Sequence, residues 1–285
     1  MKNKHKAIFC MVFSAFSFAL MNTFVRLSGD LPSIQKSFFR NFVAVIFAFV
    51  ILKKEKTPLK CKPENLKFLL IRSIAGTLGI LGNFYAVDHL VLSDASILNK
   101  MSPFFAILFS YLFLKEKLKP YQIIAVIVAF LGSLLIIKPS FLNVSFIPAL
   151  AGFLGGLGAG IAYTAVRYLG QHGEKGTFIV FFFSAFSCVV TLPYLIFAYH
   201  PMTIKQFVFL LFAGLSATGG QFGITNAYCY APAKEVSIYD YSQIIFSALL
   251  GFILFSQIPD KWSILGYITI ISSAIFMFIR NNKEA

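Results

Sequence analysis

Charged residues, tryptophan and cysteine are all scarce in this chain of 285 residues. Only 13% of the residues are charged, against about a quarter in a typical soluble domain. So few charged residues cannot cover a water-soluble globule, and a soluble protein is therefore excluded. The four cysteines, which are Cys10, Cys61, Cys188 and Cys229, lack the paired spacing of a zinc site or a disulfide framework. We therefore expect no metal site.

Motifs of enzymes and of ATP-driven pumps are also absent. No apolar segment holds a His-x-x-x-His pair, a Gly-x-Ser-x-Gly elbow or paired carboxylates. No phosphate-binding glycine-rich loop precedes a Lys-Ser or Lys-Thr pair. The sequence therefore predicts a protein that is not an enzyme, with no catalytic residues and no cofactor.

Acidic residues number only 11, against 25 lysines and arginines, which gives a formal charge of +14. If the N-terminus is cytoplasmic, most of the basic residues fall in cytoplasmic loops, as the positive-inside rule requires. The charge is then a topology signal, and no nucleic-acid partner is needed to explain it. We expect a multi-pass protein of the plasma (inner) membrane with both termini in the cytoplasm.

Apolar residues make up 58% of the chain and fall into long runs. A helix needs about 20 such residues to cross the hydrocarbon core of a bilayer. Ten segments of suitable length are present, at residues 7–26, 33–52, 68–89, 94–114, 120–138, 147–168, 177–199, 206–229, 236–255 and 262–280. The predicted fold class is an all-α membrane protein with ten transmembrane helices.

The two halves of the sequence resemble each other at a constant offset of 141 residues. For example, Thr23-Phe-Val-Arg26 aligns with Thr164-Ala-Val-Arg167, without a gap anywhere between the halves. Each half holds five spans, and because five is odd the second half must cross the membrane in the opposite sense. We predict two inverted five-helix repeats, residues 1–140 and 141–285, an architecture suited to alternating access.

Polar side chains inside the spans are the candidates for a substrate pathway, because lipid offers them no partners. In the fourth span, Pro103 removes a helical hydrogen bond and predicts a kink beside Lys100. Arg72 lies near a span end and is expected to snorkel to the surface, while Asp88 and Asp94 are expected to be solvated or capping residues. The predicted substrate-binding residues are Arg40, Asn83, Asn99, Lys100, Tyr163, Gln221, Tyr239, Asp240 and Gln243.

Several of these motifs resemble the EamA-type ten-helix transporters of the drug/metabolite transporter superfamily. The resemblance lies in Ser102-Pro103-Phe-Phe, in Leu112-Phe-Leu-Lys-Glu116-Lys-Leu118 and in Arg40 of the second span. The second half departs from the pattern, with Ile244 in place of the proline and Gln257 in place of the glutamate. The resemblance implies a secondary transporter of a small metabolite.

The charges in the spans lead to a hypothesis for the cargo. Arg40 and Lys100 would bind a carboxylate in the outer half, and Asp240 would meet an amine or a coupling proton in the inner half. A zwitterionic or anionic, amino-acid-like metabolite fits best, moving by alternating access. Two alternatives remain open: a proton-coupled exporter of cationic toxic compounds, and a membrane sensor or partner protein that transports nothing. The expected partners are the small-molecule cargo, the lipid bilayer and either a coupling proton or an exchanged metabolite, and the oligomeric state stays open.

Overall fold

The computed structural model describes residues 2–57, 59–114, 119–137, 146–230 and 239–283. The described part of the chain is helical and contains no strand. The helices are α1 (Lys2–Leu27), α2 (Ser33–Lys54), α3 (Pro63–His89), α4 (Leu92–Asn99), α5 (Ser102–Leu114), α6 (Pro120–Ile137), α7 (Phe146–Gln171), α8 (Gly176–Phe197), α9 (Ile204–Tyr230), α11 (Ser242–Phe255) and α12 (Lys261–Lys283).

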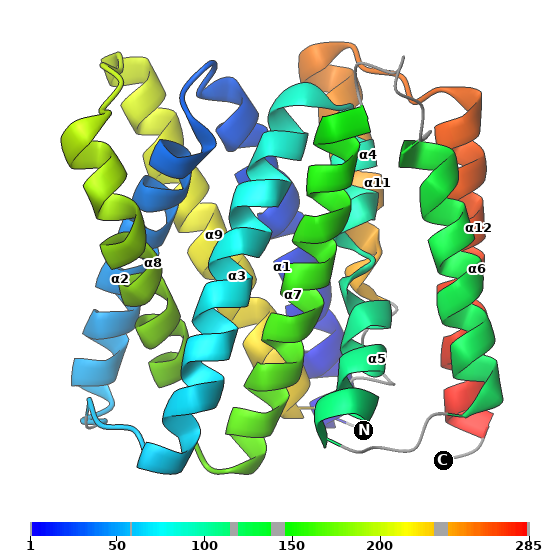
Figure 1. Ribbon diagram of the computed structural model, residues 1–285, viewed down its shortest axis with the longest axis horizontal. Coiled ribbons are helices and arrows are strands. Elements are labelled where there is room, and N and C mark those ends of the chain that lie inside the picture. The colour runs from blue at the N-terminus through cyan, green and yellow to red at the C-terminus, as the bar shows by residue number, and fades with distance from the viewer. Residues whose placement is uncertain (1, 58, 115–118, 138–145, 231–238, 284–285) are drawn as a thin grey trace.

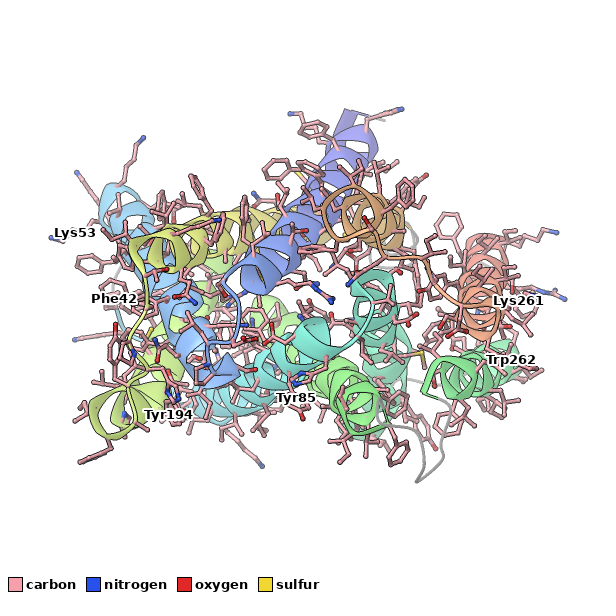
Figure 2. The ribbon with its side chains drawn as sticks, turned by 90° about the horizontal axis from the view of Figure 1, so that it is seen from above. Phe42, Lys53, Tyr85, Tyr194, Lys261 and Trp262 are labelled. Carbon is pink, nitrogen blue, oxygen red and sulfur yellow. The ribbon has the colours of Figure 1, made fainter. Side chains whose placement is uncertain are left out.

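These helices correspond to the ten predicted spans, with α4 and α5 forming one interrupted span. Seven of the described helices are long and apolar enough to cross a membrane, and α6 and α11 are shorter apolar helices. Large apolar side chains cover the outside of the bundle, where Figure 2 shows Phe42 and Trp262 pointing away from the helices. Such a surface is stable only in lipid. The predicted fold class, an all-α membrane protein, is confirmed.

The helices pack in a way that is symmetric between the two halves. The helix α3 packs along α7, and its counterpart α9 packs along α1, the counterpart of α7. The helix α2 packs against its own counterpart α8, and α6 packs against α12, at opposite edges of the molecule (Figure 1). The helix α1 begins and the helix α12 ends on one face of the bundle, which we call the terminal face; we call the other the distal face.

The two repeats make equivalent close helix contacts, at positions 141 residues apart. A side chain on Gly82 in α3 would meet the carbonyl of Ala151 in α7. Its counterpart Gly223 in α9 faces the carbonyl of Cys10 in α1, and Cys10 is the counterpart of Ala151. Because only glycine lets two backbones approach this closely, these positions fix α3 on α7 and α9 on α1.

The fourth and ninth spans are both interrupted near the middle of the molecule. The helix α4 ends at Asn99 and α5 begins at Ser102, so the kink predicted at Pro103 is a complete break. The helix α11 begins after Tyr241, the counterpart of Lys100. The hydroxyl of Tyr241 donates a hydrogen bond to the carbonyl oxygen of Lys100 at 3.2 Å. The two breaks therefore touch, as in transporters that bind cargo at interrupted helices.

Candidate functional site

A cavity lies between the two repeats, beside the helix breaks. It encloses about 590 Å³ of empty space, a volume that includes its open mouth. Its lining includes seven of the nine predicted residues, which are Arg40, Asn83, Asn99, Lys100, Tyr163, Gln221 and Gln243. Tyr239 and Asp240 are not among the lining residues: Tyr239 packs against the apolar core, and Asp240 lies behind Lys100.

Two arginines lining the cavity are buried without an acidic partner in the described ranges. Arg40 and Arg72 are each only 3% exposed. Both guanidinium groups lie over the ring of Phe183, at 5.8 Å for Arg40 and 3.9 Å for Arg72. Arg40 donates to the side-chain oxygen of Asn41, whose amide is held by the hydroxyl of Ser187 at 2.9 Å. The Nε of each arginine has no hydrogen-bond partner among the described residues.

The expectation that Arg72 snorkels to the surface is wrong. Its side chain runs toward Gly76, one turn deeper into the membrane, where a Cβ on Gly76 would collide with Nη1. The absence of a side chain at Gly76 thus leaves room for the guanidinium group, and the ring of Phe183 covers it. Sequence reasoning missed Arg72 because distance from a span end does not give the direction of a side chain.

Lys100 and Asp240 form an ion pair at the helix breaks. Lys100 Nζ lies 2.7 Å from Asp240 Oδ2, and the two side chains are 3% and 1% exposed. The predicted separation of these charges between an outer and an inner half is therefore wrong. Asp240 holds the ammonium group of Lys100 and neutralises it.

Amide side chains complete the polar lining of the cavity. Asn83 donates to Asn22 Oδ1 at 3.1 Å, while Asn22 Nδ2 and Asn83 Oδ1 are buried and find no partner within the described ranges. Asn22 was not predicted, although it is the counterpart of the predicted Tyr163 at the constant offset. Phe183 was missed because one phenylalanine among 35 carries no signal in the sequence. Among the residues that the structure describes, no three His, Cys, Asp or Glu side chains form a potential metal site.

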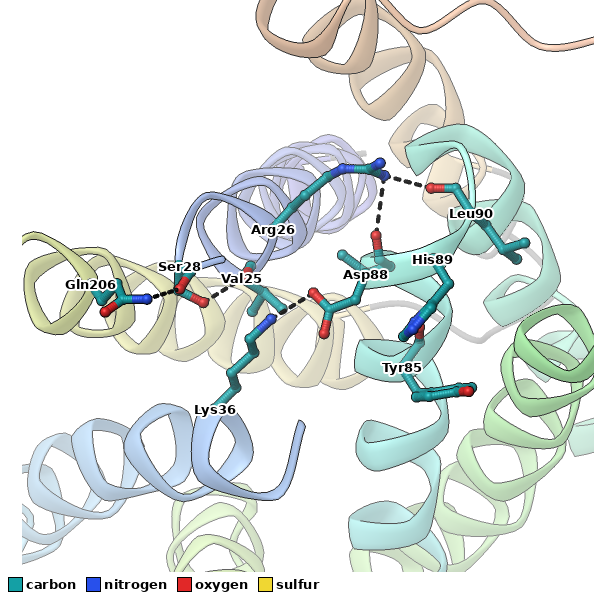
Figure 3. Close-up of polar contacts among 10 residues, drawn as sticks. Val25, Arg26, Ser28, Lys36, Tyr85, Asp88, His89, Leu90 and Gln206 are labelled. Carbon is teal, nitrogen blue, oxygen red and sulfur yellow. Dashed lines mark hydrogen bonds and ion pairs between the residues drawn. The ribbon is translucent and has the colours of Figure 1, made fainter. Parts of the chain in front are cut away.

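The distal face is closed by polar contacts between α1, α2 and α3 (Figure 3). Arg26 at the end of α1 donates to the carbonyl oxygens of Val87 and Leu90. Lys36 in α2 is fully buried, and its Nζ lies 2.6 Å from Asp88 Oδ1. Asp88, expected to be a solvated or capping residue, is therefore ion-paired, and its side chain is only 18% exposed.

Asp94 is also buried rather than solvated, since it is 8% exposed and accepts a hydrogen bond from the hydroxyl of Tyr267.

The helix α1 packs against α3 at the distal end, whereas α7 and α9, their counterparts, make no comparable contact in the described part of the chain. The two ends of the molecule are therefore closed to different degrees.

Interrupted helices from two inverted repeats, meeting beside a buried polar cavity, define a membrane transporter. Comparison with known proteins agrees: the model of the EamA-like transporter family matches residues 5–138 and 146–279, so each half holds one match. The chain belongs to the EamA-like transporter family.

Relatives of known description cover nearly the whole chain. The pseudopaline exporter CntI of Pseudomonas aeruginosa is 32% identical over 93% of both chains. An uncharacterized transporter of Helicobacter pylori is 28% identical over 91% of this chain and 90% of its own. Human solute carrier family 35 member G1 is 27% identical over 96% of this chain and 79% of its own. A crystal structure with 13% identity superposes with a TM-score of 0.69, over 97% of this chain and 98% of that chain, which supports the fold alone.

Proposed function

We propose that this transporter is a secondary carrier that moves a small anionic or zwitterionic, amino-acid-like metabolite across the plasma (inner) membrane by alternating access. The observation that carries the proposal is the pair of arginines, Arg40 and Arg72, buried in the cavity without an acidic partner in the described ranges. Buried charge without compensation is costly, so such groups are retained where a ligand of opposite charge binds. The structure favours an anionic cargo over a zwitterionic one.

Export is the direction that the relatives support, since CntI is named as an exporter. The orientation follows from the basic residues. Lys53, Lys54 and Lys56 lie on the terminal face, which we place in the cytoplasm together with both chain ends. The cavity would then load from the cytoplasm in one state and release to the outside in the other.

The alternative of a proton-coupled exporter of cationic compounds depends on Asp240, the carboxylate placed deepest in a predicted span. Asp240 is neutralised by Lys100 and does not line the cavity, so it offers a cation no free carboxylate. A cationic cargo would also meet the charges of Arg40 and Arg72. We therefore favour the anion carrier.

A thermal-shift screen of the purified full-length protein tests the proposal. The probes are matched carboxylates, amino acids and quaternary ammonium compounds. A ligand at 100 times its dissociation constant adds about 2.7 kcal/mol to the free energy of unfolding, which is readily seen as a rise in Tm. We expect carboxylates to raise Tm and quaternary ammonium compounds to leave it unchanged. Stabilisation by the cations alone would reject the anion carrier.

A further inference from the structure

Among the residues that the structure describes, four charged side chains are buried at or directly behind the cavity lining: Arg40, Arg72, Lys100 and Asp240. Lys100 and Asp240 neutralise each other across 2.7 Å. In the described ranges, neither arginine contacts a carboxylate. Counting the described residues, the cavity lining thus carries two positive charges without compensation.

We infer that the cargo is a dianion, whose two carboxylates, or groups of equivalent charge, pair with Arg40 and Arg72. This inference rests on the proposed function and narrows its substrate class. A zwitterion with no net charge would leave both buried cations uncompensated, and a monoanion would leave one. A dianion pairs with both arginines, and so removes the cost of leaving a buried cation uncompensated when the cargo is bound.

The geometry suits two carboxylates held close together. Both guanidinium groups lie over the single ring of Phe183, which keeps them in one part of the cavity. Each arginine has an Nε without a hydrogen-bond partner in the described part of the chain. A guanidinium fork binds a carboxylate through two parallel hydrogen bonds. The side chains of Gln221 and Gln243 line the same cavity and provide neutral donors and acceptors for the rest of the cargo. A short chain that bears a carboxylate at each end fits this arrangement.

Binding of a matched charge series tests the inference. The probes are butyrate, glutarate and propane-1,2,3-tricarboxylate, which carry one, two and three carboxylates on similar short chains. Their affinities for the purified full-length protein are measured by isothermal titration at neutral pH, where all three are fully ionised. We expect the wild-type protein to bind glutarate about tenfold or more tighter than butyrate, since the second carboxylate gains one charge-assisted pair.

Variants of the charged residues should shift the preferred number of carboxylates. Arg40→Gln and Arg72→Gln each leave one uncompensated cation, so the preference for glutarate over butyrate should disappear. Asp240→Asn leaves Lys100 uncompensated, so the preference should move to the tricarboxylate. Lys205→Gln, which changes an exposed lysine of the distal face, serves as the control and should keep the wild-type order. If Asp240→Asn fails to fold, the two arginine variants decide the question.

Three results would overturn the dianion. They are glutarate binding no tighter than butyrate in the wild-type protein, tightest binding by a neutral zwitterion such as glutamine, and a preference for glutarate that survives both arginine substitutions. The same binding data test the proposed anion carrier separately from the dianion. Tight binding of monoanions alone rejects the dianion and keeps the anion carrier, whereas binding of cations in place of anions rejects both.

Discussion

The buried basic residues of the distal face and of the cavity differ in whether a carboxylate pairs with them. Lys36 is paired with Asp88, whereas Arg40 and Arg72 have only the ring of Phe183 and neutral groups in the described ranges. We expect Arg40→Met and Arg72→Met to leave the Tm of the empty protein unchanged or to raise it, because each removes an uncompensated buried charge.

Lys36→Met is the matched comparison. It leaves the largely buried Asp88 without its partner and should cost about 1–3 kcal/mol of stability. Thermal unfolding in detergent measures all three variants. A large loss of Tm in the arginine variants, equal to that of Lys36→Met, would mean that the arginines are paired in the empty protein and are not available to a cargo.

Gly76 should act on the cargo through Arg72. A methyl group at this position would occupy the place of Arg72 Nη1 and press on the ring of Phe183. We expect Gly76→Ala to weaken anion binding by about tenfold, as removal of one charge-assisted hydrogen bond does. Titration with glutarate measures the effect. If Gly76→Ala binds glutarate as the wild-type protein does, Arg72 is not held in position by this glycine.

At the scale of helices, the contact between α3 and α7 depends on residues without side chains. A methyl group on Gly82 would meet the backbone carbonyl of Ala151, which cannot move aside. Gly82→Ala should therefore lower the free energy of unfolding by about 1–3 kcal/mol, the usual cost of overpacking.

The control for this substitution is Gly170→Ala on α7. No described residue lies within 4 Å of a methyl group added at Gly170, so the methyl group meets none of them. Alanine is the better helix former by about 1 kcal/mol, and the substitution should leave stability unchanged or raise it. Equal Tm values for the two variants would contradict the packing of α3 on α7.

The helices and the break in the fourth span were largely predictable from the sequence, whereas the break in the ninth span and the partners of polar side chains were not. Long apolar runs give the helix positions because lipid demands them, and Pro103 gives the break because it removes a backbone hydrogen bond. The ion pair of Lys100 and Asp240 joins residues far apart in the chain, and its formation depends on how the two repeats meet. The offset of 141 residues could have suggested this pair. It aligns Lys100 with Tyr241, the neighbour of Asp240, and equivalent positions of two repeats meet where the repeats pack on each other.

At the scale of the whole molecule, the two ends differ in closure. The contacts of Lys36 with Asp88 and of Arg26 with Val87 and Leu90 join α1, α2 and α3 at the distal face. Alternating access requires these contacts to break when the cavity opens on that side. Weakening them should therefore shift the population toward the state open to the distal face.

Accessibility of a cysteine in the cavity measures that shift. In a variant without native cysteines, Ile80→Cys places a thiol in the cavity lining. We expect Asp88→Asn to increase its rate of labelling by an impermeant maleimide added at the distal face, while Lys205→Gln leaves the rate unchanged. No increase with Asp88→Asn would mean that the ion pair does not hold this face closed.

We propose that an anionic cargo crosses the membrane through contact with Arg40 and Arg72. Counterflow in proteoliposomes tests it most directly, with the carboxylate that stabilises the protein most in the thermal-shift screen as the labelled compound. We expect counterflow by the wild-type protein and its loss in the double variant Arg40→Gln/Arg72→Gln, while that variant keeps the wild-type Tm in the absence of ligand. Undiminished counterflow by the double variant would contradict the claim.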